Sequence, residues 1–230
     1  MKDYLIITGT NRGLGKAFFD YFMDAPATIV AISRSFPDYQ QEHSVSNGSI
    51  LVKCDLAELK DPSSIPLLNG LASQKIERLT FINNAATIHP VGPIGNLDPI
   101  DIAQSVHTNI VAPLLLINYL VTLNSNKLKV INITSGAAQR EIEGWAMYCS
   151  TKAAMEMFCR VLEKQYQKLG RVEVLQPDPG LVDTGMQEFI RASDKSDFPS
   201  VKTFKEAYEH GKLQSPKVVV EKIVKLAQID

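Results

Sequence analysis

Short runs rich in β-branched residues alternate along this 230-residue chain with longer segments of helical periodicity. The runs predict strands at residues 4–8, 28–33, 50–54, 79–83, 129–134 and 171–176. The longer segments predict helices at 15–23, 65–74, 100–123 and 146–169. Strand–helix alternation implies parallel strands joined by right-handed crossovers, with helices covering both sheet faces. The sequence therefore predicts an α/β fold built on a doubly wound parallel sheet.

The composition is that of one domain with a substantial core. Of the residues, 45% are hydrophobic and no compositional shift divides the chain, so residues 1–230 are predicted to form a single domain. A net charge of -1 leaves no basic field to attract nucleic acid or acidic lipid. Cys54, Cys149 and Cys159 have neither metal-ligand spacing nor a disulfide pattern. Reduced thiols in the cytoplasm, and no bound metal, are expected.

Neither a secretory leader nor a membrane span is expected. The first apolar run, at residues 4–8, is too short for a signal core. The most apolar later run, 110–123, contains Pro113, Asn118 and Thr122 and is shorter than the roughly 20 residues that a span needs. It is interpreted as a buried or interface helix.

A polar, charged stretch at residues 183–212 interrupts the alternation. An insertion of this length at the carboxyl edge of a sheet is more often a lid or a short helical excursion than a plain connector. A substrate lid is therefore predicted here. Ser215 and Pro216 then predict the N-cap and first turn of a last helix at 217–227.

A glycine-rich turn follows the first strand directly and leads into a helix. Its residues are Gly9, Thr10, Asn11, Arg12, Gly13, Leu14 and Gly15. Glycines at such a point allow a pyrophosphate to approach the backbone N–H groups at the positive end of the helix. The spacing G-x-x-x-G-x-G differs from the commoner G-x-G-x-x-G fingerprint. The turn predicts a dinucleotide site, with a plain glycine turn as the alternative.

The end of the second strand indicates which dinucleotide is bound. An acid there accepts the ribose 2′-OH of NAD, whereas a basic residue accommodates the 2′-phosphate of NADP. The strand ends in Ser33 and Arg34 with no acid at its tip, and Arg12 can close on the same phosphate. NADP(H) is therefore predicted, against the alternative of solvated surface arginines. Asp55, followed by Leu56, is a candidate adenine contact or a helix cap.

Tyr148 and Lys152 are candidate catalytic residues because they lie four residues apart, about one helical turn. A neighbouring cation favours phenolate, so Lys152 is expected to lower the pKa of Tyr148 from about 10. Ser135 follows a strand at the ligand-binding edge and can polarise a carbonyl together with the phenol. Asn109 is a buried amide that can hold a water linking Lys152 to solvent. A structural loop serine is the alternative for Ser135.

Taken in order, these motifs resemble the short-chain dehydrogenase/reductase family. The resemblance covers nearly the whole chain and includes the Asn83-Asn84-Ala85-Ala86 element and Pro179-Gly180. It implies that Tyr148 is the general acid/base, that Lys152 binds the nicotinamide ribose, and that Ser135 orients the substrate oxygen. It implies a proton relay supported by Asn109. It also implies cofactor contacts from Asn84, Ala85, Ala86, Pro179, Gly180, Val182 and Thr184.

Within that family the sequence is most similar to sepiapterin reductases and bacterial benzil reductases. The segments that carry this likeness are 144–149 and 183–187. The implied substrates are small-molecule vicinal dicarbonyls or α-hydroxy ketones on an aromatic frame. Trp145, Met147 and Met186 are candidate apolar walls, with core or lid packing as the alternative.

The sequence departs from the family pattern at two points. Ala86 stands where the family usually has glycine, and no match exists for the seventh strand and the tail whose aspartate anchors pterin in sepiapterin reductases. These departures leave pterin specificity open. A catalytically idle NADP-binding sensor is the second hypothesis, because folds of this kind also serve regulators. A nucleotide-sugar epimerase is disfavoured because it would need a larger carboxyl-terminal substrate domain than the roughly fifty residues after Pro179 can form.

A homodimer or homotetramer is expected. The helical segments 109–123 and 146–169 are apolar on more than one face, as is typical of helices that cover both a sheet and a neighbouring subunit.

Overall fold

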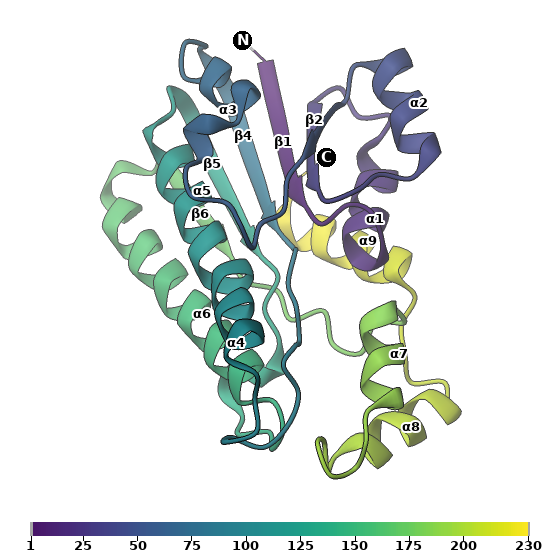
Figure 1. Cartoon of the computed structure of the whole chain (residues 1–230). Helices are drawn as coiled ribbons and strands as arrows, with labels where there is room; N and C mark the ends of the chain where they lie inside the picture. The colour runs from purple at the N-terminus through teal and green to yellow at the C-terminus, as the bar shows by residue number, and fades with distance from the viewer. Residues whose placement is uncertain (1, 230) are drawn as a thin grey trace.

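The structure, a computed structural model, describes residues 2–229 and contains one six-stranded parallel sheet (Figure 1). The strand order is β3-β2-β1-β4-β5-β6. The order reverses at β1, which pairs with both β2 and β4. The bounds are β1 Lys2–Thr8, β2 Thr28–Ser33, β3 Ile50–Lys53, β4 Ile76–Asn83, β5 Ser125–Asn132 and β6 Val172–Leu175. The predicted doubly wound α/β fold is confirmed.

Alternate side chains of β1 enter two separate cores because successive residues of a strand point to opposite faces. Tyr4 and Ile6 belong to the core shared with three helices on one face, and Leu5 and Ile7 to the core shared with two helices on the other. Figure 1 shows the two groups on opposite sides of the sheet. The first group is α3 Pro66–Leu71, α5 Ala112–Thr122 and α6 Ala146–Tyr166, and the second is α1 Gly13–Phe22 and α9 Pro216–Ala227.

Strand ends and one helix differ from the sequence prediction. β4 and β5 begin three and four residues earlier than predicted, and the helix expected at 65–74 is shortened to α3 after a 3₁₀ turn, Pro62–Ser64. Helix α2, Asp38–Asn47, was not predicted at all. Its sequence is polar and only Gln40 and His43 are buried, so it carries almost no apolar periodicity.

The segment predicted as one helix at 100–123 is continuous but irregular. It contains α4 Pro99–Val106, a π-helical turn at His107–Val111 and then α5. Pro113 has no N–H to offer the carbonyl group of Asn109, four residues earlier, so regular α-helical bonding is interrupted there.

This helix is longer than the apolar run that the sequence analysis judged too short to span a membrane. Within residues 2–229 it is the one helix, Pro99–Thr122, that is long and apolar enough to cross a membrane by length and composition. The sequence estimate counted only 110–123. Leu116, Ile117 and Leu120 are fully buried against the sheet, so we interpret it as a core helix.

The stretch 183–212 forms two helices, α7 Gly185–Ala192 and α8 Val201–Glu209, beyond the carboxyl ends of the strands (Figure 1). The loop between them packs on Gly144, where an added Cβ would lie 2.2 Å from the Asp197 carbonyl oxygen. Gly144 also has a φ of +84°. The chain then returns to the sheet through α9, whose N-cap Ser215 accepts a hydrogen bond from the Val218 N–H as predicted.

Candidate active site

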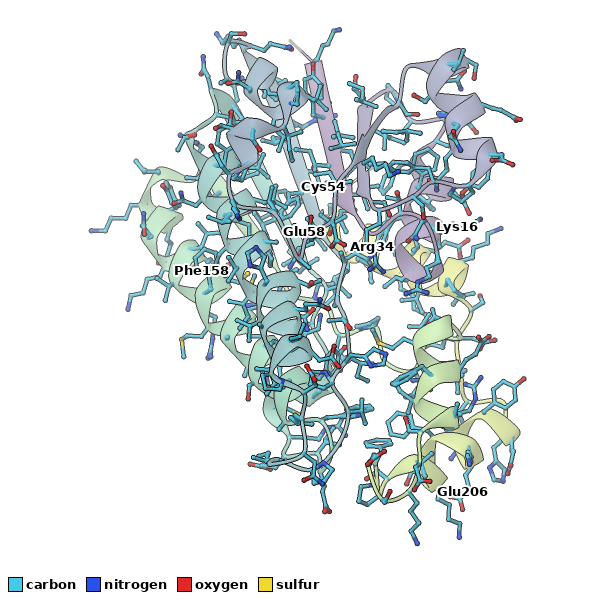
Figure 2. All side chains as sticks on the ribbon, in the orientation of Figure 1. Lys16, Arg34, Cys54, Glu58, Phe158 and Glu206 are labelled. Carbon is cyan, nitrogen blue, oxygen red and sulfur yellow. The ribbon has the colours of Figure 1, made fainter. Side chains whose placement is uncertain are left out.

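A cavity of about 1260 Å³ runs along the carboxyl edge of the sheet, from the glycine turn to α8. This is the edge where open parallel sheets bind ligands, next to the point where the strand order reverses. Figure 2 shows Arg34, Cys54 and Glu58 together near the strand ends, and Glu206 far away on α8. A smaller hollow of about 480 Å³ lies around Lys2 and Pro26, where the sequence carries no motif.

The glycine turn is held in a shape that only glycine allows at two points. Gly9 has a φ of +75° and Gly13 a φ of +56°. A Cβ on Gly15 would lie 2.1 Å from the Gly9 carbonyl oxygen and 2.4 Å from Nδ2 of Asn84. Arg12, the N-cap of α1, makes no side-chain capping bond. The first N–H groups of α1 therefore have no side-chain cap, as an anion-binding helix end requires.

Hydrogen bonds join this turn to the end of β4. The Thr8 hydroxyl oxygen accepts from the N–H groups of Asn84 and Ala85, both at 3.0 Å. Nδ2 of Asn84 donates to the Thr8 carbonyl oxygen at 2.9 Å. The Asn83-Asn84-Ala85-Ala86 element and the glycine turn therefore form one wall.

Two arginines line the cavity at the end formed by the glycine turn and β2. Arg12 and Arg34 both line it and both are exposed. Within residues 2–229 neither guanidinium forms an ion pair with a carboxylate. Nδ2 of Asn11 donates to the Ser35 hydroxyl at 3.3 Å and so ties the glycine turn to the tip of β2.

Asp55 also lines the cavity, but it begins no helix. Its Oδ1 accepts from the Ala57 N–H at 3.0 Å and so stabilises a turn after β3. The helix cap considered as an alternative for Asp55 is therefore wrong, since the N–H that it satisfies belongs to a turn.

Ser135, Tyr148 and Lys152 meet in the middle of the cavity. Ser135 follows β5, and its hydroxyl is close enough to that of Tyr148 to influence the Tyr148 pKa, while its Oγ accepts from the Ala137 N–H at 3.2 Å. Tyr148 and Lys152 share a face of α6, as their spacing predicted. Nζ of Lys152 lies 5.7 Å from the Tyr148 ring centroid and donates to the Ile133 carbonyl oxygen at 2.8 Å.

The predicted direction of the Tyr148 pKa shift is wrong for this arrangement. Burial raises the pKa of Tyr148 to about 12, because desolvation penalises phenolate more than the nearby Ser135 hydroxyl favours it. The negative charge of Asp178 acts in the same direction as burial. Lys152 does not offset these effects, because its ammonium group lies over the ring and bonds to Ile133 rather than to the phenol oxygen.

Burial also lowers the pKa of Lys152 to about 8, although the carboxylates of Asp178 and Glu156 oppose that shift. At neutral pH the site therefore holds a neutral phenol beside an ammonium group. That is the protonation state of a proton donor rather than of a proton acceptor.

Asn109 lies behind this group rather than in the cavity, and 4% of it is exposed. Its Oδ1 accepts from the Thr87 N–H, and its Nδ2 donates to the Thr87 carbonyl oxygen, both at 2.8 Å. Nδ2 also donates to the Thr151 hydroxyl at 3.1 Å. All of these bonds go to protein groups, so the Asn109 amide joins the segment after β4 to helix α6.

The other end of the cavity is apolar and aromatic. Trp145 stacks on Phe198 at 4.6 Å between ring centroids and lies 5.3 Å from Phe204 and 5.7 Å from Tyr148. Trp145 and Met186 line the cavity as predicted. Met147 does not, because the turn of α6 that aims Tyr148 inward carries Met147 away from the cavity.

Most predicted cofactor residues lie on the cavity wall. They are Gly9, Asn11, Arg12, Gly13, Leu14, Ser33, Arg34, Asp55, Leu56, Asn84, Ala85, Ala86, Pro179, Gly180, Val182 and Thr184. Thr10 and Gly15 do not line it: Thr10 is fully buried and Gly15 packs against Gly9 and Asn84.

Several cavity residues were missed in the sequence. They include Glu58, Thr87, Ile88, His89, Asp101, Gln104, Arg140, Ile142, Gln187, Phe189, Ile190, Thr203 and Phe204. Those on α7 had a usable signal, because Met186, Phe189 and Ile190 recur at helical spacing within the polar stretch. Arg140 and His89 lie in loops and had none.

A parallel sheet with a glycine turn at its reversal point, and a serine, tyrosine and lysine in the cleft beside it, defines a dinucleotide-dependent oxidoreductase. The chain belongs to the short chain dehydrogenase family, whose model matches residues 3–195. The family likeness inferred from the motifs is thereby confirmed.

Relatives of known activity align over almost the whole chain. A benzil reductase ((S)-benzoin forming) of Bacillus cereus is 31% identical and covers 99% of this chain and 94% of its own. Sepiapterin reductase of Xenopus tropicalis is 26% identical, with coverages of 98% and 91%. The solved KRED1-Pglu enzyme is 26% identical, with a TM-score of 0.84 and coverages of 99% and 95%. The protein is an oxidoreductase that acts on carbonyl or carbinol groups with a nicotinamide cofactor.

Proposed function

We propose that this protein is an NADPH-dependent carbonyl reductase for vicinal dicarbonyls or α-hydroxy ketones that carry an aromatic group. One observation carries the proposal: Ser135 and Tyr148 lie in a single cavity between an arginine-bearing end and an aromatic end. The first end suits a dinucleotide phosphate, and the second suits an aryl substrate. The reductase activities of the relatives support the same substrate class.

The cavity fits a dinucleotide through residues of this chain. The uncapped N-terminus of α1 and the close approach allowed by Gly9 and Gly13 would hold the pyrophosphate. Arg12 and Arg34 would hold a 2′-phosphate, since both line the cavity and neither is neutralised by an ion pair within residues 2–229. When bound, the nicotinamide supplies the hydride.

The residues at the centre then supply the proton. Ser135 and Tyr148 would donate hydrogen bonds to the substrate carbonyl oxygen, which polarises the carbonyl and stabilises negative charge as it develops there. Tyr148 would give its phenolic proton to that oxygen, since a pKa near 12 keeps the phenol protonated at neutral pH. Lys152, as an ammonium, would orient the ribose and return a proton to the phenolate that the transfer leaves behind.

Reprotonation of Tyr148 would draw a proton from solvent through Lys152. The side chain of Asn109 is already bonded to Thr87 and Thr151, but its backbone carbonyl lacks the usual helical donor at Pro113. We propose that this carbonyl, rather than the amide, holds the relay water. Asn109 would thus act through its backbone and fix the local geometry with its side chain.

The aromatic end favours a flat, apolar substrate. Trp145, Phe204 and Met186 line it, and Trp145 is held in place by stacking on Phe198. Binding of an aryl ring there would be favoured by burial of its apolar surface and by packing against the aromatic rings. Residues 183–212 would serve as the lid over this end, because α7 and α8 supply much of its wall.

The same chain is proposed to act as one domain in a cytoplasmic homodimer or homotetramer. Met157 and Val161 lie one turn apart on α6 and are 53% and 55% exposed. A second subunit packed on that face would cover them.

An idle NADP-binding sensor is the competing function. A regulator needs only the nucleotide end of the cavity, so nothing would require a serine and a tyrosine to meet beside a buried lysine. The assembled Ser135–Tyr148–Lys152 group therefore favours the reductase.

The reductase proposal is tested by following oxidation of NADPH and NADH with sepiapterin, benzil, other diketones and simple aldehydes. We expect NADPH to be consumed in preference to NADH, and benzil-like diketones to react faster than simple aldehydes. Tight NADPH binding with no turnover on any diketone or hydroxy ketone would support the sensor instead.

Substitution of Arg12 and Arg34 by alanine is expected to raise KM for NADPH by about 10- to 100-fold, because charge-assisted bonds to the 2′-phosphate are lost. KM for NADH should change little, since that ribose carries no such phosphate. Steady-state kinetics with both coenzymes measure the difference. An equal loss with the two coenzymes would contradict the NADP assignment.

The reduction rate is expected to be level at and below neutral pH and to fall as pH rises through about 8, where Lys152 loses its proton. Tyr148 stays protonated up to a pKa of about 12, so it does not set this limit. Asp178→Asn removes a charge that raises the pKa of Lys152, so its rate should begin to fall at lower pH. A kcat/KM profile that rises with pH would contradict the assignment of Tyr148 as proton donor.

A further inference from the structure

Glu156 lies on α6 one turn beyond Lys152, and its two carboxylate oxygens accept hydrogen bonds from both sides of Ser135. One oxygen accepts from the Thr134 hydroxyl at 2.6 Å and the other from Nε2 of Gln139 at 3.2 Å. Thr134 directly precedes Ser135, and Gln139 ends the 3₁₀ turn that follows it, Gly136–Gln139. A single side chain therefore holds both ends of the loop that carries Ser135.

Lys152 holds the adjoining residue of the same segment. Its Nζ donates to the carbonyl oxygen of Ile133. Lys152 and Glu156 therefore hydrogen-bond to the two successive residues directly before Ser135. The Glu156 backbone carbonyl also accepts from Nε2 of Gln176, at 3.4 Å, in the segment after β6. Three chain segments thus meet at one turn of α6.

We propose that Glu156 is a positioning residue for carbonyl reduction, which holds the Ser135 loop at the separation from Tyr148 where both hydroxyls can reach one substrate oxygen. The inference rests on the proposed function. A charge-assisted O–H···O⁻ bond of this length is among the stronger hydrogen bonds in proteins. A displacement of about 1 Å at a reacting group can cost about 10²-fold in rate, so loss of the Glu156 hydrogen bonds should lower kcat.

The charge of Glu156 has a second effect at the same place. It faces Lys152 and Cys159 on its own helix, and Asp178, in the loop after β6, is the other carboxylate that acts on Lys152. Glu156 raises the pKa of Lys152 against the effect of burial. The effect of the Glu156 hydrogen bonds and the effect of its charge on Lys152 can therefore be separated by the choice of substitution.

The test compares four variants of the full-length enzyme in NADPH-dependent reduction of benzil. Glu156→Ala removes bonds and charge, Glu156→Gln can keep the Thr134 bond without the charge, and Thr134→Val removes one donor only. Glu163→Gln is the matched control, because it removes an exposed charge from the same helix two turns farther on. Melting temperature and NADPH affinity are measured for each variant.

We expect Glu156→Ala and Thr134→Val to lower kcat by about 10- to 100-fold with little change in NADPH affinity. Glu156→Gln should restore kcat to within about threefold of the wild type, since an amide can accept the Thr134 hydrogen bond. Its alkaline loss of rate should begin at lower pH, whereas the profile of Thr134→Val should not move. Glu163→Gln should match the wild type.

The inference is overturned if folded Glu156→Ala or Thr134→Val keeps kcat within about twofold of the wild type, a change below about 0.4 kcal/mol. It is also overturned if lower activity only follows a lower melting temperature and Glu156→Gln gives no rescue. If Glu156→Ala does not fold, Thr134→Val and Glu156→Gln decide the question. An inactive wild type overturns the proposed function and this inference together.

Discussion

Tyr148→Phe is expected to lower kcat for carbonyl reduction by about 10²- to 10⁴-fold, the usual contribution of a positioned general acid. The substitution removes the hydroxyl that Ser135 contacts and leaves the ring, which packs edge-on against Trp145. Because the ring stays, the fold and the NADPH affinity should change little. Stopped-flow or steady-state NADPH oxidation measures the rate, and fluorescence titration measures the affinity.

Tyr166→Phe is the matched control for this prediction. It removes a phenolic hydroxyl from the last residue of the same helix, outside the cavity. Its kcat should equal that of the wild type. Turnover of Tyr148→Phe at the wild-type rate would contradict the proposed mechanism, whereas joint loss of turnover and NADPH binding would indicate damage to the site as a whole.

Gly15→Ala is expected to destabilise the protein by at least about 1–3 kcal/mol, the usual cost of forcing extra atoms into a packed region. The added Cβ would lie 2.1 Å from the Gly9 carbonyl oxygen, which is backbone and can give way only if the turn itself moves. Since that turn holds the N-terminus of α1 at the cavity, NADPH affinity should fall as well, by about tenfold or more. Urea unfolding and fluorescence titration measure the two effects.

Gly70→Ala provides the opposite case within the same chain. Gly70 is exposed in α3, and an added Cβ there would meet nothing within 4 Å. Alanine should therefore stabilise the protein by up to about 1 kcal/mol through helix propensity and leave NADPH binding unchanged. If Gly15→Ala behaved like Gly70→Ala, the close approach of the glycine turn to α1 would not be a constraint on folding.

The sheet could be predicted from sequence because its strands are short and rich in β-branched residues, and the central ones are buried on both faces. Thr28–Ser33 was predicted to the residue, since every residue after Thr28 is buried. Helix α2 could not be found in the same way. It contacts the rest of the protein through polar side chains such as Gln40, whose Nε2 donates to the Thr10 carbonyl oxygen, and apolar periodicity does not record such contacts.

The candidate site was predictable where chemistry and chain order coincide. Ser135 follows a strand and Tyr148 begins a helix, so both were expected at the ligand-binding edge. The pKa of Tyr148 was not predictable from spacing, because its direction depends on how deeply the phenol is buried and on where Nζ of Lys152 points. Glu156 was missed for a similar reason: its partners Thr134 and Gln139 lie 17 or more residues away in the chain.

Transfer of deuterium from NADPH labelled at C4 of the nicotinamide to benzil is the most direct test of the central claim that this protein reduces carbonyl groups by hydride transfer. We predict that label from one face of the ring is recovered at the carbinol carbon of benzoin, with one product formed for each NADPH consumed, and that Tyr148→Phe suppresses this transfer. NADPH bound tightly with no labelled carbinol from benzil or any other diketone would contradict the account.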